Sequence, residues 1–309
     1  MSTLINNNRE KQGAQAMEKT TVVYIDGKYF NKEDAKISVW DHGFLYGDGV
    51  FEGIRVYSGN VFRMKQHIDR LYDSAKSICL EIPIDKKEMM DAVLETCRRN
   101  ETNDGYIRLV VSRGKGDLGL DPKKCSKASV VIISDKISLY PEEKYKNGLR
   151  VTISSVRKNF HESMSSKVKS LNYLNNILAK IEAGHIGADE IVLININGYV
   201  TECSADNIFI VKNGVLITPH PSVGLLEGIT RGAVIDIAKE EGIELREDFL
   251  TSHDLYVADE MFLTGTGAEI VPVVWVNGRT VGEGKPGKMT MELLKKFREL
   301  VKVDGVKIK

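Results

Sequence analysis

The order of apolar patterns along this chain of 309 residues limits its possible folds more than any other feature. Apolar runs on either side of Asp26-Gly27, a two-residue turn signal, predict a hairpin over residues 22–30. Helical spacing over residues 68–79 and 90–97 then predicts two helices, and strands are expected at 106–112 and 129–133. Strands, paired helices and strands in this order predict an α+β unit and not a repeated βαβ winding.

A polar stretch divides the chain into two predicted domains. Residues 138–148 read SLYPEEKYKNG, which is typical of an interdomain linker. We therefore expect a smaller α+β domain at 20–137 and a larger, sheet-rich domain at 149–309. In the larger domain we expect strands at 150–156, 191–196 and 199–202, and helices at 231–241 and 290–301. Residues 1–19 are polar and lack a period, so we expect an extension or added leader there.

Composition argues against several classes of partner. The chain has 43 basic and 43 acidic residues, so its zero net charge gives no reason to expect a nucleic acid or an anionic membrane. No apolar run is long enough to span a bilayer. Four cysteines without CxxC spacing predict a reduced, cytoplasmic protein without a metal site.

Lys169 lies where an extended segment is predicted to pass into a helix. Apolar residues at 171, 174, 178 and 181 predict a buried helix face that ends near Gly184 and draws Lys169 into the protein. A desolvated lysine amine can act as a Schiff-base nucleophile and as a proton shuttle. Lys167, two residues earlier, would share a strand face with Lys169 and is the competing candidate.

Six motifs in order resemble one known family. They are DHGFLYGDGVFEGIR (41–55), YIR (106–108), KSLNYLNNILA (169–179), VTECSADNIF (200–209), GITR (228–231) and GTGAEI (265–270). From about Val22 to Val301 the chain resembles the fold-type IV pyridoxal-phosphate enzymes, and among them the branched-chain amino acid aminotransferases. The resemblance implies an α+β, two-domain fold-type IV enzyme. It also implies ping-pong transamination of L-leucine, L-isoleucine and L-valine with 2-oxoglutarate, giving 2-oxo acids and L-glutamate.

The same resemblance implies pyridoxal 5'-phosphate as the cofactor. Lys169 is implied to hold it as a Schiff base, since only this lysine has the family's spacing to Asn172 and Tyr173. Glu202 is implied to face the pyridine nitrogen, which must stay protonated if the ring is to withdraw electrons. Tyr173 is implied to bind the 3'-oxygen of the ring.

The cofactor's phosphate needs anion recognition without a P-loop. Residues 228–231 are predicted to open a helix, so the backbone N–H groups of Ile229 and Thr230 can form a cup for an anion. Thr266, between two glycines, offers a hydroxyl and a further N–H group. Arg63 is implied by the resemblance to be the phosphate-binding arginine.

Substrate recognition is predicted from one strand. Tyr106 and Arg108 are two residues apart, so both leave one face of the strand, while residues 107, 109 and 111 leave the other and can build a core. The resemblance implies that Tyr106 helps to bind the α-carboxylate, with backbone N–H groups of Thr266 and Gly267. It assigns the distal carboxylate of glutamate or 2-oxoglutarate to Arg108. The implied lining of the hydrophobic side-chain pocket is Tyr46, Phe51 and Tyr140.

Four other functions are alternatives to branched-chain transamination: two are enzymes of the same fold, one is a ligand-binding protein and one is a dehydrogenase. Parts of the chain, notably YGDGVFE, KSLN and GITR, resemble D-amino acid aminotransferases almost as well. Those enzymes usually lack the Tyr106-x-Arg108 pair and carry an Arg-x-His pair in the loop equivalent to 114–122, which here reads GKGDLGLDP. Aminodeoxychorismate lyases generally lack the FEGIR and YIR combination. A ligand-binding protein that kept the fold would not need Lys169, and an NAD-linked dehydrogenase would need a GxGxxG unit that the sequence lacks. The resemblance also implies a homodimer or higher homo-oligomer.

Overall fold

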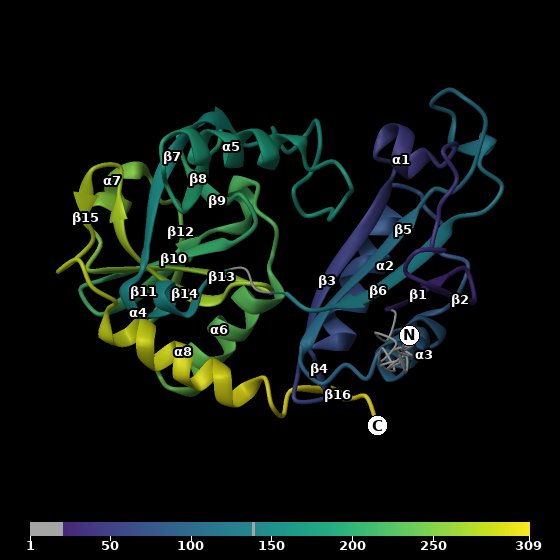
Figure 1. The fold of residues 1–309 in the computed structure, drawn as a ribbon. Coiled ribbons are helices and arrows are strands. Elements are labelled where there is room, and N and C mark those ends of the chain that lie inside the picture. Colours follow the sequence, from purple (N-terminus) through teal and green to yellow (C-terminus); the bar gives the residue numbers. More distant parts are fainter. Residues whose placement is uncertain (1–20, 138–139) are drawn as a thin grey trace, which may run out of the picture.

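Two sheets, each covered by helices, make up the fold (Figure 1). The computed structural model describes residues 21–137 and 140–309. The predicted extension at 1–19 and the first two residues of the predicted linker lie outside the described residues. No helix within the described ranges is both long and apolar enough to cross a membrane.

The N-terminal sheet has seven strands in the order β16-β4-β3-β5-β6-β1-β2, and every neighbouring pair is antiparallel. Its strands are β1 (Val22–Ile25), β2 (Lys28–Asn31), β3 (Gly49–Tyr57), β4 (Asn60–Phe62), β5 (Gly105–Ser112), β6 (Ser129–Asp135) and β16 (Gly305–Lys307). The helices α2 (Met64–Ser77) and α3 (Lys86–Arg99) pack against it, and the short α1 (His42–Tyr46) precedes β3. The predicted hairpin, helix pair and two strands are therefore confirmed.

Strand β5 fixes which side chains can reach a site. Ile107 and Leu109 are fully buried in the core under α2, where Ile68 and Leu71 meet them. Because successive side chains of a strand alternate, Tyr106 and Arg108 leave the opposite face of the sheet. That face looks toward the C-terminal part of the chain.

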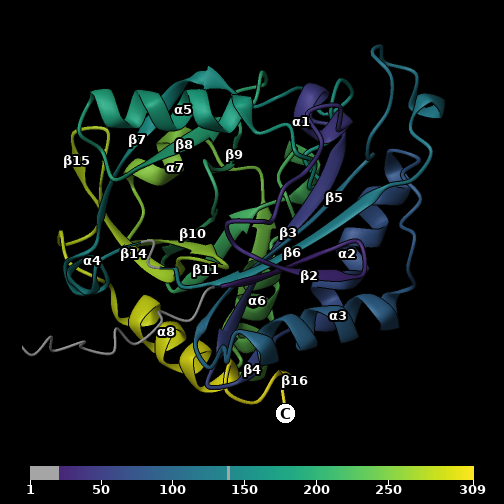
Figure 2. The ribbon, with the colours of Figure 1, turned by 45° about the vertical axis from the view of Figure 1, so that its right-hand side comes forward.

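The C-terminal sheet has nine strands, eight of them in the order β12-β11-β10-β13-β14-β7-β8-β9, with β15 paired to β14. Its strands are β7 (Leu149–Arg157), β8 (Glu190–Ile194), β9 (Val200–Cys203), β10 (Asn207–Lys212), β11 (Val215–Pro219), β12 (Leu245–Asp248), β13 (Glu260–Gly265), β14 (Glu269–Val276) and β15 (Arg279–Thr280). The helices α6 (Ile229–Glu240) and α8 (Lys288–Leu300) pack together against it. The helix α5 (Leu174–His185) packs on β7 and β8 (Figure 2). The short helix α7 (Ser252–Tyr256) follows β12.

Two features depart from the predicted domain limits. The C-terminal strand β16 pairs with β4 of the N-terminal sheet, so residues 305–307 return to the first domain (Figure 1). Within the predicted linker, Glu142–Asn147 form the helix α4, which begins after Pro141 and ends at Gly148 with φ of 80°. Proline at the start and glycine at the end of a helix are favourable positions for both residues.

The prediction of a helix at Lys169 was wrong in its start and in its buried face. The segment before α5 pairs instead with β3: Phe51 N donates to Lys169 O at 3.0 Å, and Leu171 N donates to Gly49 O at 2.9 Å. The predicted buried stripe is exposed, with Leu174 at 67% and Leu178 at 47%, while Ala179 is buried in its place. Alanine lets the helix approach β7 and β8 closely, and the larger leucines point outward.

Candidate active site

A cavity of about 500 Å³ lies where the two sheets meet. Its walls come from β3 and β5 on one side and from β9, the start of α6 and the turn after β13 on the other. It brings together ten of the predicted site residues: Phe51, Tyr106, Arg108, Lys169, Tyr173, Glu202, Ile229, Thr230, Thr266 and Gly267. Within the described ranges, no group of three or more His, Cys, Asp or Glu side chains could hold a metal ion.

Lys169 lines this cavity with its backbone fixed from the N-terminal domain. Its N–H group donates to Ser74 Oγ of α2 at 3.1 Å, and its carbonyl accepts from Phe51 of β3. The amine donates to Tyr173 Oη at 3.0 Å and lies 4.6 Å from the ring centre of Phe51. Desolvation, assisted by the charge of Arg70, lowers the pKa of Lys169 to about 8. A substantial fraction of the amine is therefore neutral near pH 8.

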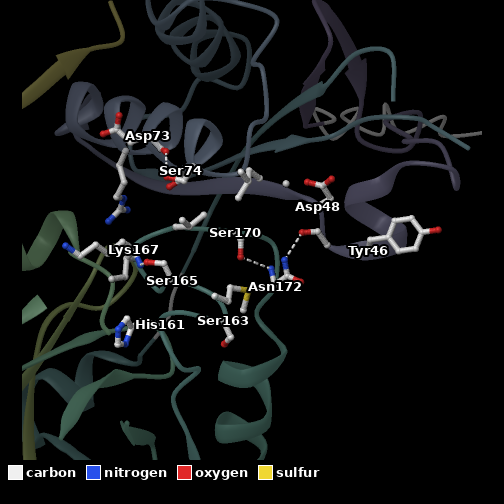
Figure 3. Close-up of a pocket in the computed structure, with 18 of the residues that line it drawn as sticks. Tyr46, Asp48, Asp73, Ser74, His161, Ser163, Ser165, Lys167, Ser170 and Asn172 are labelled. Carbon is white, nitrogen blue, oxygen red and sulfur yellow. Dashed lines mark hydrogen bonds between the residues drawn. The ribbon is translucent and has the colours of Figure 1, made fainter. Parts of the chain in front are cut away.

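Lys167 is directed elsewhere. Its side chain is exposed, and its amine forms an ion pair with Glu227 Oε1 at 3.0 Å. Figure 3 shows it in a second, larger cavity of about 860 Å³ that adjoins the first. The two lysines of the KVK segment thus face different spaces, and only Lys169 reaches the cavity that holds the other predicted groups.

Glu202 is buried, and both of its carboxylate oxygens have partners. Oε1 lies 2.7 Å from Lys158 Nζ, and Oε2 accepts from the N–H group of Leu226 at 3.0 Å. Lys158 is itself only 6% exposed, and no periodic pattern in the sequence indicates this ion pair. Desolvation together with the charge of Glu202 raises the pKa of Tyr173 to about 12, so the hydroxyl keeps its proton.

The start of α6 provides the free N–H groups on which the prediction of an anion cup rests. Gly228 is the N-cap, so Ile229 and Thr230 are the first helical residues, whose N–H groups have no partner within the helix. A side-chain carbon on Gly228 would lie 2.1 Å from Asn207 Oδ1, so only glycine fits there. Thr266 follows on a separate turn of the same cavity.

Arg63, predicted to bind phosphate, lies outside this cavity. Its guanidinium forms ion pairs with Asp304 at 2.7 Å and Asp236 at 2.8 Å, and its backbone caps α2 with φ of 45°. The geometry does not support the predicted role, because the cavity that contains Ile229, Thr230 and Thr266 is not lined by Arg63. Arg70, further along α2, lines the cavity instead.

Arg70 is held by a carboxylate buried in strand β3. Its Nε and Nη2 donate to Glu52 Oε1 and Oε2 at 2.7 and 2.9 Å, and His67 Nδ1 lies 2.7 Å from the same Oε2. Burial alone would raise the pKa of Glu52, but Arg70 and His67 lower it to about 2. The sequence did contain a signal: a glutamate in the apolar run VFEGI requires a cationic partner.

Arg108 and Tyr106 form one wall of the cavity. The guanidinium of Arg108 lies 4.7 Å from the ring centre of Phe51 and 5.4 Å from that of Tyr106, and no carboxylate in the described chain pairs with it. Tyr106 packs so closely on β3 that a side-chain carbon at Gly53 would lie 1.9 Å from its hydroxyl. Gly53 thus leaves the space that Tyr106 occupies.

Tyr46 and Tyr140 do not line this cavity. Tyr46 lies at the rim of the larger cavity (Figure 3), where its hydroxyl accepts from Gly119 N at 3.0 Å. Tyr140 donates to Glu190 Oε2 at 3.4 Å and packs against the core of the C-terminal sheet. The prediction placed both tyrosines in the wall of the side-chain pocket, but within one chain neither of them lines this cavity.

The fold and this set of side chains define an aminotransferase of class IV. A family model for class IV aminotransferases matches residues 49–276, and the chain belongs to this family. The predicted α+β fold class is confirmed with it.

Within this class, the chain is similar in sequence and in structure to proteins named branched-chain amino acid aminotransferases. The chain is 54% identical to a putative branched-chain-amino-acid aminotransferase of Methanocaldococcus jannaschii, over 93% of this chain and 98% of the relative. The crystal structure of the Escherichia coli branched-chain amino acid aminotransferase has a TM-score of 0.89 at 37% identity, covering 92% of this chain and 95% of that one. The branched-chain amino acid aminotransferase from Thermobaculum terrenum, crystallised in its PLP-bound holo-form, has a TM-score of 0.84 at 29% identity, covering 92% and 94% of the two chains.

The donor set of the cavity fits a phosphorylated pyridine aldehyde. Lys169 offers an amine of lowered pKa, and Glu202 offers a buried carboxylate for a ring nitrogen. The N–H groups at Ile229 and Thr230 and the guanidinium of Arg70 can receive a phosphate. These groups belong to one cavity, as a single ligand requires.

Proposed function

We propose that this protein is a pyridoxal-phosphate-dependent branched-chain amino acid aminotransferase. It transfers the amino group of L-leucine, L-isoleucine or L-valine to 2-oxoglutarate, giving the branched-chain 2-oxo acid and L-glutamate. The observation that carries this proposal is the presence, in one cavity, of Lys169 and of an arginine, Arg108, stacked on aromatic rings and free of any described carboxylate. The names of the relatives reported above support it.

We assign the cofactor's contacts to residues of this cavity. Lys169 binds its aldehyde carbon, Glu202 faces its ring nitrogen, and Tyr173 faces its 3'-oxygen. Its phosphate lies at Ile229, Thr230 and Thr266, with Arg70 in the role first predicted for Arg63. When bound, pyridoxal phosphate supplies an electron sink for the bond to be broken at the substrate's α-carbon.

The protein's own residues then move the proton and hold the charges. The neutral amine of Lys169 would accept the proton from the substrate's α-carbon and hand it on to the cofactor, which its lowered pKa allows at a moderate pH. Tyr173 remains protonated beside it and donates a hydrogen bond. Glu202 is kept in place by Lys158 and by the N–H group of Leu226, so its carboxylate is oriented before any ligand arrives.

One cavity must accept both an aliphatic chain and a second carboxylate. Its apolar surface includes Phe51, Val110 and Leu171, which suits a branched aliphatic side chain. Arg108 can bind the distal carboxylate of glutamate. When a branched aliphatic substrate is bound and that carboxylate is absent, the guanidinium remains stacked on the rings of Phe51 and Tyr106. Tyr106 and the N–H groups at Thr266 and Gly267 bind the α-carboxylate.

A donor panel tests the proposal. With 2-oxoglutarate as acceptor, L-leucine, L-isoleucine and L-valine are expected to be used and D-alanine is not. In Arg108→Ala, kcat/KM for glutamate and 2-oxoglutarate is expected to fall by about 10²-fold, because a buried carboxylate loses its charged partner, while the half-reaction with leucine changes much less. A preference for D-alanine would overturn the proposed function. An equal loss for leucine and glutamate would reject the role of Arg108 alone.

We also propose that the protein is a homo-oligomer of the cytoplasm. Four apolar side chains of α5 are about half exposed or more, as are two others in or near α1: Leu174, Ile177, Leu178, Ile181, Phe44 and Leu120. The helices α5 and α1 lie on the same side of the molecule in Figures 1 and 2, and exposed apolar area of this kind favours association between chains. Light scattering is expected to give at least a dimer, which Leu178→Asp should weaken; a wild-type monomer would contradict this.

The cysteines support the proposed cytoplasmic location. All four are free thiols, in keeping with a reducing compartment.

A further inference from the structure

Asp206 is a buried acid of the active-site cavity to which the proposed mechanism gives no role. It lies in the turn between β9 and β10, is 4% exposed, and lines the same cavity as Lys169 and Thr266. Its Oδ2 atom is buried without a hydrogen-bond partner among the described residues. Its Oδ1 atom packs on Gly265, where an added side-chain carbon would lie 1.9 Å away. The carboxyl group therefore sits directly against the turn that carries Thr266.

The nearby cations already belong to other acids. Lys158 pairs with Glu202 at 2.7 Å, and Lys180 pairs with Glu190 at 2.6 Å. Within the described chain no Lys, Arg or His nitrogen lies within ion-pair distance of Asp206. Glu190 and Glu202 raise its pKa, and Lys180 lowers it from beyond that distance. Of these three acids, Asp206 is the one that lacks a counter-charge among the described side chains.

The remaining groups around Asp206 do not supply that charge. The Cys203 thiol is fully buried, and its pKa is raised well above its usual range, first by desolvation and then by Glu190. The phenols of Tyr140 and Tyr145 also have raised pKa values, mainly through burial. Lys169 acts on Asp206 from across the cavity, but its own amine is partly neutral. An ionised Asp206 would be an unpaired buried charge, which is costly.

We propose that Asp206 is a proton-binding residue of the cavity: where it is ionised, it takes up one proton when an anionic ligand binds at the Gly265-Thr266-Gly267 turn, and it is neutral in the loaded enzyme. A phosphate or carboxylate at Thr266 adds negative charge beside a carboxyl group that already lacks a partner. The neutral form removes this repulsion and can donate its O–H group inside the cavity. This inference rests on the proposed function, which places the cofactor phosphate and the substrate carboxylate at that turn.

The linkage has a definite sign. Desolvation, followed by the charge of Glu190, raises the pKa of Asp206 to about 7 in the ligand-free chain. At pH 6 the group is already mostly protonated, so binding requires little proton uptake. At pH 8 about nine-tenths of the chains carry the ionised form, so binding takes up about 0.9 proton and the apparent affinity falls by about tenfold.

Calorimetric titration of pyridoxamine 5'-phosphate into the apoenzyme, in buffers of different ionisation enthalpy, tests this. Asp206→Asn, which cannot ionise, is expected to bind about tenfold more tightly than wild type at pH 8 and equally at pH 6, with a lower proton uptake at pH 8. Asp206→Ala is expected to lose the same proton. Asp73→Asn, an exposed acid in the adjoining larger cavity (Figure 3), is the matched control and should behave as wild type.

The infrared spectrum of the loaded enzyme gives a second readout. At pH 8 the wild-type holoenzyme is expected to show a protonated-carboxyl C=O band that is absent in Asp206→Asn. Equal proton uptake in wild type and Asp206→Asn, or no such band, would overturn the inference while leaving the proposed function intact. Failure of pyridoxamine 5'-phosphate to bind wild type at either pH would instead count against the proposed function.

Discussion

Replacing Lys169 by alanine is expected to lower kcat for leucine–2-oxoglutarate transamination by at least about 10³-fold. The change removes a cavity amine whose pKa is lowered toward the working range, and with it both the covalent attachment of the cofactor and the group that moves the proton. Pyridoxamine phosphate should still bind, because the phosphate cup and Glu202 are untouched. Steady-state assays and cofactor titration together check this.

Lys167→Ala is the matched control for that experiment. Lys167 is exposed and pairs with Glu227 in the adjoining cavity, so its loss is expected to change kcat less than about twofold. Borohydride reduction of the loaded wild-type enzyme should fix the cofactor's mass on the peptide that carries Lys169. A comparable loss in both variants, or a label on Lys167, would show that the assignment between the two lysines is wrong.

Local patterns predicted the elements of the fold well where neighbouring residues decide the outcome. The Asp26-Gly27 hairpin, the α2–α3 pair and the alternation of β5 follow from turn chemistry and periodicity, and these were confirmed. The start of α5 could not be predicted in the same way. Residues 169–171 have helical spacing with the leucines that follow, but β3 offers them backbone partners from more than 100 positions away. Only the tertiary fold reveals that competition.

The same distinction applies to the site. Tyr106 and Arg108 could be placed on one face because two residues of one strand fix that geometry. Arg63 and Arg70 both lie in the segment that leads into or forms α2, and both pair with acids. Choosing between them required knowledge of which one lines the cavity, and that is Arg70. Ion pairs between distant parts of the chain, such as Lys158 with Glu202, carry no sequence period. These pairs set the electrostatics of the cavity, so sequence patterns found most of its members but not their charge balance.

Glu52→Gln is expected to lower the free energy of unfolding at pH 7 by about 3–5 kcal/mol, the typical result of removing one partner from a buried ion pair. Glu52 is fully buried and accepts hydrogen bonds from Arg70 and His67, so the amide would leave the Arg70 charge uncompensated. Glutamine keeps the size of the side chain, which separates the loss of charge from the creation of a cavity. Denaturant titration of wild type and variant measures the difference in the free energy of unfolding, with equal m-values showing that the surface exposed on unfolding is unchanged.

The pH dependence of this difference identifies its electrostatic origin. The pKa of Glu52 is lowered to about 2 in the folded chain, so its stabilising effect is fully present above the ordinary glutamate pKa and is lost as the pH falls through 2. The difference in the free energy of unfolding between wild type and Glu52→Gln should therefore shrink by about 3 kcal/mol when the pH falls from 6 to 2. Glu95→Gln, which removes a partly exposed partner of Arg98 and Arg99, should remain close to wild type throughout. A gap for Glu52→Gln that stays constant with pH would mean that packing, and not the carboxylate's charge, accounts for the loss.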